Sequence, residues 1–460
     1  MNRRLNALSG LTLAASALFF PPRADAANDA MMDLLNVLKE QGTITEEAYE
    51  QLSSASKADD EANTADTAQV KQAAQTLPKI ETKGKLEISS PEGDFKFGVG
   101  GRVQVDAAWY NEEDTDAGET TDLDSGAEFR RARLSAFGTL WKHWNFKSEI
   151  DFAENGVDLK DVYIANTYLK PLTIKVGNFK EPFSLEQLTS SRFLTFLERS
   201  LADAFVPERN LGAALYYAGS NWTAAGGVFS EGVDDDDEDV EVDGGEGIGV
   251  TGRITAAPLL DSKRLVHVGG AISWRDPEAS PADTLLQFRQ RPESHVADQR
   301  LVDTGEFAGT EDFLRYGAEG AFAWGPGSLQ AEYIYTDVNR NIEDVNFNGW
   351  YIYGSWFLTG ESRAAAYKVE KGAFDRVKPF SNFGSGGWGA WEIAARYSTI
   401  DLDDEDILGG EQDDFTFGLN WYPNPNLRLM ANYVKVLDIE GGEFEGASPD
   451  IFQLRAQVDW

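Results

Sequence analysis

The sequence contains no cysteine, so no disulfide framework can hold this 460-residue chain together. Beyond the first 26 residues, no apolar run reaches the roughly 18 residues that a membrane-spanning helix needs, which excludes a helical membrane protein. Basic residues are scarce beside acidic ones, 41 against 77, and the formal net charge is −36. This balance excludes nucleic acid as a partner, because phosphates require a basic surface.

Catalytic and cofactor motifs are missing too. The three histidines, His143, His267 and His295, lie in no serine or metal-ligand pattern. The glycines of Gly98–Gly101 precede a predicted strand rather than a helix, which excludes a phosphate-binding loop. We therefore expect no enzyme, no metal and no cofactor. A barrel enzyme such as a lipase is a rival interpretation, but it requires a histidine near a serine on an outward-facing strand.

Residues 1–26 have the pattern of a secretory signal peptide. Arg3 and Arg4 precede an uncharged apolar stretch, Leu11–Phe20, and Ala24-Asp25-Ala26 resembles a cleavage site. The alternative is an amphipathic N-terminal helix of the mature chain. Residues 27–57 predict a helical hairpin, a candidate for oligomerisation or else a frayed tail, and the polar residues 58–94 predict a linker.

From Phe95 onward the apolar residues recur with a period of two. The last segment shows this best, because Phe452, Leu454, Ala456, Val458 and Trp460 alternate with polar residues. One apolar face and one polar face are typical of a transmembrane barrel strand, with lipid outside and a wet lumen inside. A secreted β-sandwich would also alternate, but the apolar faces here exceed what one core can bury.

Similar segments predict an all-β fold, a sixteen-stranded antiparallel transmembrane β-barrel over residues 95–460 with a short N-terminal helical hairpin. Short and long connections alternate along the chain, as they do in bacterial barrels. The link 359–387 is an exception, since it is long but falls on the short-turn side. Sixteen strands are expected near 95–110, 127–141, 143–153, 158–168, 171–178, 211–219, 222–230, 246–256, 264–274, 312–324, 327–337, 345–358, 388–399, 412–422, 426–437 and 449–460.

Basic residues recur on the inward side of the predicted strands. The period places Arg131 and Arg133 in the lumen, with Lys147 on the next strand and Arg253 further along. Guanidinium groups suit oxyanions because they stay charged and offer planar, bidentate donors. Inward carboxylates occur beside them, so a lumen of balanced charge is the alternative. The acidic run Asp234–Asp239 indicates a solvated outer loop that could also bind divalent ions bridging to anionic lipid.

Several motifs resemble the phosphate-selective porin O and P family, from about Phe95 to the C-terminus. They are Phe129-Arg130-Arg131-Ala132-Arg133-Leu134, Trp144-Asn145-Phe146-Lys147, Leu159-Lys160-Asp161, Val176-Gly177-Asn178-Phe179-Lys180-Glu181-Pro182-Phe183, Leu188-Thr189-Ser190-Ser191-Arg192 and Phe196-Leu197-Glu198-Arg199. The resemblance implies a homotrimeric barrel in which loops 179–210 and 275–311 and the turn 359–387 enter the lumen.

The resemblance also implies site residues. Arg130 and Arg131 match paired arginines of an outer ladder. Asp161, Ser190, Ser191 and Arg199 match a central anion site, and Lys368, Lys371, Arg376 and Lys378 are candidates for the periplasmic path. Gln187 departs from the pattern, since it stands where phosphate-selective members carry a lysine. The full predicted anion-binding and pore-lining set is Arg130, Arg131, Arg133, Lys147, Asp161, Ser190, Ser191, Arg192, Arg199 and Arg253.

The sequence therefore predicts a porin of the Gram-negative outer membrane, exported by its signal peptide. It would pass small anions by diffusion, phosphate or polyphosphate among them, and contact outer-membrane lipid and lipopolysaccharide. The alternative function is a general, weakly selective outer-membrane porin.

Overall fold

The computed structural model describes residues 24–82, 86–111, 121, 123–153, 156–230, 232–233, 240–243, 247–277, 280–281 and 284–460. The chain divides into two compact units, Met1–Lys79 and Ile80–Trp460. The expected signal peptide lies outside the described residues except for Ala24–Ala26. The acidic run 234–239 also lies outside them.

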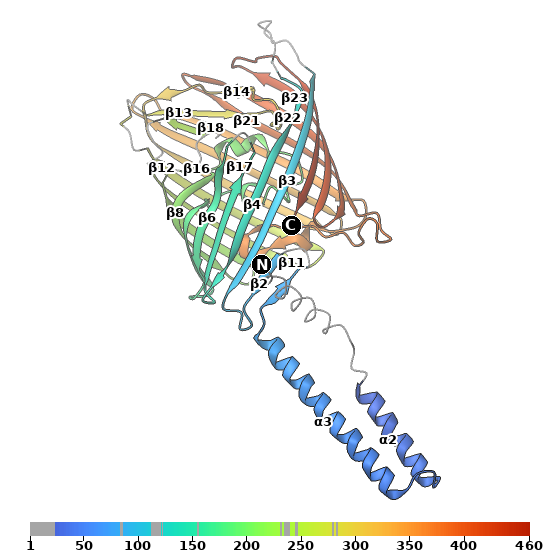
Figure 1. Ribbon diagram of the computed structural model, residues 1–460. Coiled ribbons are helices and arrows are strands. Elements are labelled where there is room, and N and C mark those ends of the chain that lie inside the picture. The colour runs from blue at the N-terminus through green and yellow to red at the C-terminus, as the bar shows by residue number, and fades with distance from the viewer. Residues whose placement is uncertain are drawn as a thin grey trace, which may run out of the picture. The chain divides into compact units, whose positions relative to one another are not determined.

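The N-terminal unit contains two helices, α2 (Ala24–Glu40) and α3 (Glu46–Thr76), that lie side by side (Figure 1). The turn between them contains Gly42 in a left-handed conformation with φ of 68°. The Tyr49 hydroxyl donates to the side-chain oxygen of Asn36 at 2.6 Å, and Lys39 pairs with Glu46 at 2.6 Å. Among the described residues, no helix is long and apolar enough to cross a bilayer.

Helix α3 continues well into the stretch for which the sequence predicted a linker. The linker was expected from residue 58, but the helix ends only at Thr76. Residues 58–76 contain many alanines and neither glycine nor proline, so their helix propensity is high although they have few apolar side chains. Low apolar content therefore did not exclude helical structure in this segment.

In the second unit, sixteen of the described strands form one closed antiparallel barrel (Figure 1). They are β3 (Lys96–Asn111), β4 (Gly126–Leu140), β5 (Trp144–Asp151), β6 (Asp158–Asn166), β7 (Leu172–Lys180), β8 (Arg209–Ala218), β9 (Trp222–Phe229), β11 (Ile248–Leu260), β12 (Arg264–Asp276), β16 (Thr310–Trp324), β17 (Gly327–Arg340), β18 (Val345–Phe357), β21 (Ala390–Asp404), β22 (Ile407–Asn424), β23 (Leu427–Glu440) and β24 (Asp450–Asp459). The predicted strand count and approximate positions are confirmed.

Neighbouring barrel strands pair in sequence order, and β24 pairs with β3 to close the ring. Closure matters because an open sheet edge in lipid would leave backbone groups without hydrogen bonds. Along β24 the inward Gln453, Arg455 and Gln457 are buried, whereas the outward Phe452 and Leu454 are exposed. The apolar face therefore points outward and the polar face inward, as the period of two predicted.

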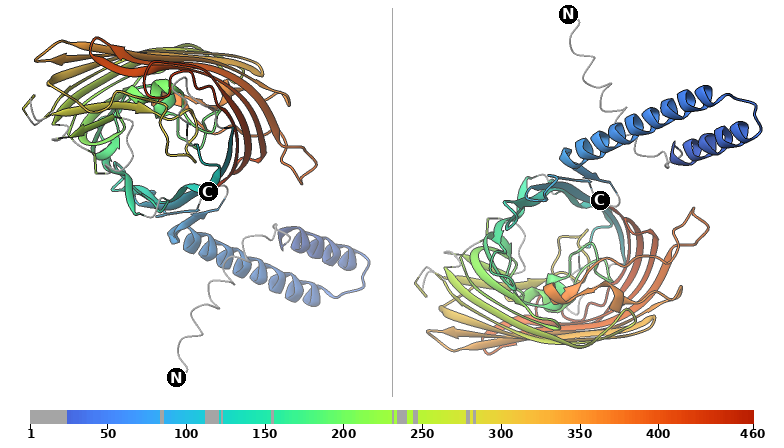
Figure 2. Two further views of the ribbon diagram at one scale, coloured as in Figure 1. Left: turned by 90° about the horizontal axis from the view of Figure 1, so that it is seen from above. Right: turned by 90° about the horizontal axis from the view of Figure 1, so that it is seen from below.

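Three connecting segments lie inside the ring of strands (Figure 2). The constriction loop, residues 181–208, joins β7 to β8 and contains α4 (Leu185–Leu188) and η2 (Leu201–Phe205). A second segment joins β12 to β16 and contains β13 (Leu285–Gln290), β14 (Val302–Asp303) and β15 (Phe307–Ala308). The long turn, residues 358–389, joins β18 to β21 and contains η3 (Arg363–Ala366), β19 (Tyr367–Lys368), η4 (Val369–Lys371) and β20 (Ala373–Phe374). These are the segments that the family resemblance placed in the lumen.

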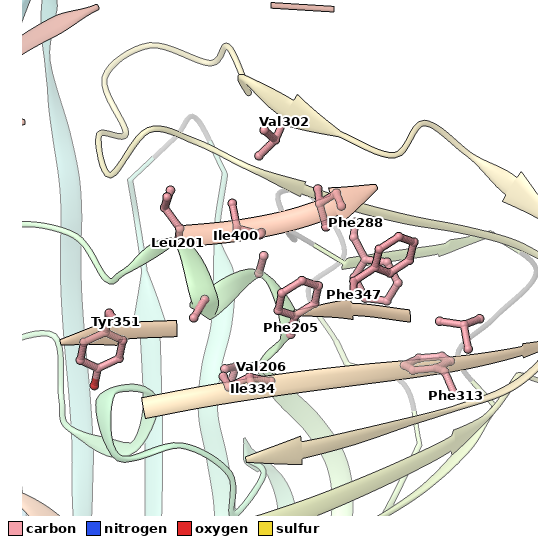
Figure 3. Close-up of a cluster of buried hydrophobic side chains, with 14 of the residues drawn as sticks. Leu201, Phe205, Val206, Phe288, Val302, Phe313, Ile334, Phe347, Tyr351 and Ile400 are labelled. Atoms are coloured by element: carbon pink, nitrogen blue, oxygen red, sulfur yellow. The ribbon is translucent and has the colours of Figure 1, made fainter. Parts of the chain in front are cut away.

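Apolar packing holds these segments against one part of the inner wall (Figure 3). Leu201 and Phe205 of the constriction loop contact wall residues such as Ile334 and Phe347, with Phe288 of β13 between them. A separate cluster joins Phe374 of the long turn to the wall. Wall strands β16–β21 thus have apolar side chains on both faces, whereas β4–β9 border open space.

Three shorter strands complete the set. Strand β1 (Lys79–Glu81) follows α3, and β2 (Leu86–Ser89) pairs antiparallel with β3. Strand β10 (Val240–Asp243) pairs with β13.

Candidate pore constriction

A cavity of about 1270 Å³ lies between the constriction loop and the wall strands opposite it. All ten residues of the predicted set line this cavity. They come from β4, β5, β6 and β11 and from the constriction loop, so the fold brings together side chains far apart in sequence. Lys371 and Arg376 of the long turn also border it, whereas Lys368 and Lys378 are not among the described lining residues.

A β-bulge places two consecutive arginines on the lumen side of β4. Gln104 of β3 pairs with Arg131, but the next pairing joins Asp106 to Glu128, so β4 has one more residue than β3 at this point. Arg131 is buried, and Arg130 reaches the carboxylate of Glu198 in the constriction loop. A strict period of two would have directed one of the two arginines toward lipid.

Glu198 is the centre of an arginine cluster. Its carboxylate lies 3.1 Å from Arg130, 3.7 Å from Arg131 and 2.5 Å from Arg455, and Arg455 also pairs with Asp106 at 2.6 Å. Burial alone would raise the pKa of Glu198, but the charges of the three arginines outweigh it and hold this pKa well below its ordinary value. Glu198 therefore stays ionised and links the loop to the wall.

A second group of cations surrounds the carboxylate of Glu149 on β5. Lys147 lies 3.3 Å from it, while Arg133 and Arg192 each lie at 3.6 Å. Arg133 also pairs with Asp151. With more cations than carboxylates here, Glu149 cannot neutralise all of its neighbours.

Of the predicted central residues, Asp161 lies on β6, whereas Ser190, Ser191 and Arg199 lie within the constriction loop. Asp161 accepts hydrogen bonds from Lys147 at 2.6 Å and from Arg209 at 2.8 Å, so it is engaged by cations of the wall. Arg199 lies 3.6 Å from Asp203. Ser190 accepts a hydrogen bond from the backbone N–H of Arg192 at 3.4 Å.

Ser191 and Arg253, the remaining residues of the predicted set, contact other parts of the barrel and its inward segments. Ser191 accepts a hydrogen bond from Arg102 at 2.6 Å. Arg253 lies apart from the arginine cluster, where it pairs with Glu319 at 2.6 Å and donates to the carbonyl of Gly372 in the long turn at 2.8 Å. Arg253 therefore also fastens the long turn to the wall.

Two basic residues that the sequence reasoning missed stand where the constriction loop leaves the wall. Lys180 ends β7 and donates to the backbone carbonyl of Gln187 at 2.8 Å, while Arg209 begins β8. Lys180 thus supplies an ammonium beside the position where Gln187 replaces a family lysine. A signal was available, since both cations lie at the ends of the predicted loop 179–210.

The carboxyl group of Asp203 in the constriction loop has a pKa well above its ordinary value. Burial and the nearby carboxylates of Glu186 and Glu208 raise the pKa of Asp203 to about 7, although Arg199 opposes the shift. Glu208 behaves in the opposite way, because Lys180 and Arg209 outweigh its burial and lower its pKa. The pKa of the Asp203 carboxyl group therefore lies near neutral pH.

The charge balance of the cavity differs from that of the whole chain. Among the described residues that line it, seventeen are lysine or arginine and ten are aspartate or glutamate. The chain as a whole has a formal net charge of −36. The fold has therefore gathered a positive surplus at the pore.

A closed barrel with an apolar outer face, a charged lumen and loops folded inward is the architecture of a porin of the Gram-negative outer membrane. Residues 97–460 match the family model described as phosphate-selective porin O and P, and the chain belongs to this family. It is 32% identical to porin O of Pseudomonas aeruginosa over 77% of this chain and 86% of that protein.

Two other proteins show the extent of the similarity. The chain is 32% identical to an uncharacterised protein of Caulobacter vibrioides, over 79% of this chain and 72% of that protein. Among solved structures, the outer-membrane channel DcaP of Acinetobacter baumannii matches with a TM-score of 0.50 and 11% identity, over 80% of this chain and 98% of that one. This structural likeness concerns the fold alone.

Proposed function

We propose that the protein is an anion-selective pore in which the constriction loop and the facing wall form the selective part of the path. The observation that carries this proposal is the surplus of lysine and arginine around the cavity in an otherwise strongly acidic chain. Anions cross by diffusion, and no covalent step is involved.

Screening decides which charges set the preference. Exposed charges separated by more than a Debye length, about 8 Å at physiological salt, are largely screened, whereas the apolar band of a barrel is about 25 Å tall. Acidic side chains on the outer loops therefore act weakly at the constriction. Buried arginines such as Arg131 are screened much less, so they dominate the field that an ion meets inside.

Phosphate is the anion class that we propose for the constriction. Arginines offer paired donors that match phosphate oxygens, and lysines such as Lys147 add compact point charges. The porin O similarity supports the same class. Polyphosphate has the same recognisable chemistry repeated along a chain, so we include it among the expected solutes.

One observation favours a second candidate, a general pore of weak selectivity. Many lumen cations already contact carboxylates, such as Arg455 with Asp106 and Arg209 with Asp161. Paired charges hold the wall together and attract ions less than unpaired ones. A pore of this kind would discriminate little between chloride and potassium.

Reversal potentials in a planar bilayer distinguish the two candidates. Purified protein is placed in a potassium chloride gradient, and then potassium phosphate replaces the chloride on one side. The proposal requires a clear anion preference at about 0.15 M salt and interference of phosphate with chloride current. A reversal potential near zero or of cationic sign contradicts it and supports the general pore.

We also propose that the barrel assembles as a homotrimer and contacts outer-membrane lipid and lipopolysaccharide through its apolar outer face. The family resemblance supports the trimer, and the exposed aromatic and aliphatic side chains of strands such as β24 support the lipid contact. Chemical cross-linking in native membranes, followed by mass measurement of the product, tests the oligomeric state.

A further inference from the structure

One lysine of the cavity differs from the others in its surroundings. Lys147, Lys160 and Lys371 each lie within 3.5 Å of a carboxylate, and Lys180 donates to Gln187. Lys175 has no carboxylate or hydrogen-bond acceptor as a partner among the described residues. No described carboxylate therefore pairs directly with this ammonium.

Three aromatic rings surround this ammonium. The Nζ atom of Lys175 lies 4.6 Å from the ring centre of Tyr163, 4.8 Å from that of Phe179 and 4.5 Å from that of Tyr216. The rings come from three successive wall strands, β6, β7 and β8, and all of them border the cavity. Phe179 is buried and packs edge-on against Phe229, which gives the group a rigid base.

The backbone is shaped to allow this arrangement. Gly177 lies opposite Tyr163 in the pairing of β6 and β7, and its φ is 136°. A Cβ atom at Gly177 would collide with the backbone oxygen of Val162 and would lie 2.7 Å from the Cα of Tyr163, closer than real Cβ contacts. Glycine therefore lets Tyr163 approach β7, next to Lys175.

The wall around Lys175 is apolar compared with the arginine cluster. Pro171, Tyr217, Ala218 and Ala224 line the same stretch, which lies near the short-turn ends of β7, β8 and β9. This site is poorly suited to bind inorganic phosphate, because phosphate needs hydrogen-bond donors on several sides. A carboxylate attached to an aromatic body fits better, with its oxygens on the ammonium and its ring against tyrosine rings.

We propose that Lys175, Tyr163, Phe179 and Tyr216 form a subsite for aromatic carboxylates, separate from the arginine-lined constriction. The carboxylate pairs with the Lys175 ammonium, and the ligand's ring packs against the faces and edges of the tyrosines. This inference rests on the proposed anion pathway, since the ligand reaches the subsite through the pore. It extends the expected solutes from inorganic to organic anions.

Block of chloride current tests the subsite. Sodium benzoate, sodium acetate and sodium phosphate are added in turn to the short-turn side of single channels, and the half-blocking concentration of each is measured. We expect benzoate to block at about one tenth of the acetate concentration, since ring contacts of this kind are commonly worth that factor. Equal potency of benzoate and acetate on the wild-type pore overturns the proposal.

Two variants separate charge from rings. K175M should raise the half-blocking concentration of benzoate by about tenfold or more, because it removes the charge that pairs with the carboxylate. Y216L keeps the ammonium but removes one ring, so it should reduce the advantage of benzoate over acetate. Block that is unchanged in both variants contradicts the subsite.

A matched control and a second readout make the outcome unambiguous. K263M removes an ammonium from an exposed short turn outside the cavity, and its benzoate block should equal that of the wild type. Heat-modifiable gel mobility shows that each variant has a closed barrel. If the wild-type pore prefers cations yet benzoate block depends on Lys175, the proposed anion pathway fails and the subsite stands. Anion preference without benzoate discrimination rejects the subsite alone.

Discussion

The backbone oxygen of Trp460 accepts a hydrogen bond from the N–H of Gly101 at 3.1 Å, and the backbone N–H of Trp460 donates to the oxygen of Gly101 at the same distance. This reciprocal pair extends the β3–β24 ladder to the last residue of the chain. A Cβ atom at Gly101 would collide with the Trp460 ring and would lie 2.8 Å from the backbone oxygen of Arg133. The absence of a side chain at Gly101 is therefore part of how the barrel closes.

The first prediction concerns this closure. G101A should destabilise the barrel by about 1–3 kcal/mol, because a backbone atom cannot move aside as a flexible side chain can. G226A is the control, since a Cβ there would have its nearest neighbour, the backbone oxygen of Thr251, at 3.6 Å, an ordinary contact. The temperature at which the folded band disappears on gels measures the effect. Equal temperatures for the two variants would contradict the prediction.

Removing Trp460, or replacing it with lysine, should impair assembly. The residue closes the ladder and places an exposed aromatic ring on the outer surface, where barrels have an aromatic girdle. The amount of variant in isolated outer membranes is compared with that of the wild type. Normal levels would show that closure does not depend on the last residue.

Packing of the constriction loop should control pore size. Phe205 is fully buried against Phe288, with ring centres 5.6 Å apart, so F205A should cost about 3–5 kcal/mol of loop anchoring. The barrel should remain closed while its conductance rises and its selectivity falls. F129A removes the same ring from the exposed outer face and should leave conductance unchanged. Unaltered single-channel conductance in F205A would contradict this account.

The pKa of about 7 for Asp203 predicts a pH-dependent anion preference. Because this pKa is raised, the carboxyl group is neutral below about pH 7 and negative above it, and the positive surplus of the constriction decreases as pH rises. Anion selectivity should therefore be higher at about pH 5.5 than at about pH 8.5. D203N should hold the acidic-pH selectivity across this range. A wild-type selectivity that stays constant with pH, or that falls in acid, would refute this role for Asp203.

Selectivity should depend more on the lumen arginines than on the acidic outer loops. Replacing Arg131 and Arg199 with alanine should lower anion selectivity more than neutralising Asp234–Asp237 raises it, because the sequence predicts a solvated loop for these acidic residues, and solvent screens such charges more strongly. Reversal potentials at about 0.15 M and about 0.01 M salt provide the measurement, since loop charges reach further at the lower salt. An unchanged preference in the double variant would leave the general pore as the better interpretation.

Deleting residues 29–76, which make up most of α2 and α3, should leave a working pore. The sixteen barrel strands pair with one another around the ring, and β24 closes on β3, so hydrogen-bond closure does not require the helices. Single-channel conductance of the truncated protein is compared with that of the full chain. Loss of conductance in a protein that still reaches the outer membrane would assign the helices a role in the pore.

Much of the barrel could be predicted because alternation is a local property. Successive side chains of a strand point to opposite faces whatever the rest of the chain does, so the inward direction of Arg133 and Arg455 follows from their neighbours. The helix propensity of residues 58–76 is equally local, but the linker was predicted from low apolar content alone, without this propensity. Sequence by itself thus determined the number of strands and which side chains face inward.

Tertiary structure alone decided how the inward segments pack and which charges meet. The bulge that turns both Arg130 and Arg131 inward depends on pairing with β3, and the contact of Glu198 with Arg455 joins residues 257 positions apart. The placement of three aromatic rings around Lys175 likewise depends on the register of three strands. Such contacts follow from strand register and loop packing across the ring, and no local pattern encodes them, because side chains distant in sequence become neighbours only when the barrel closes.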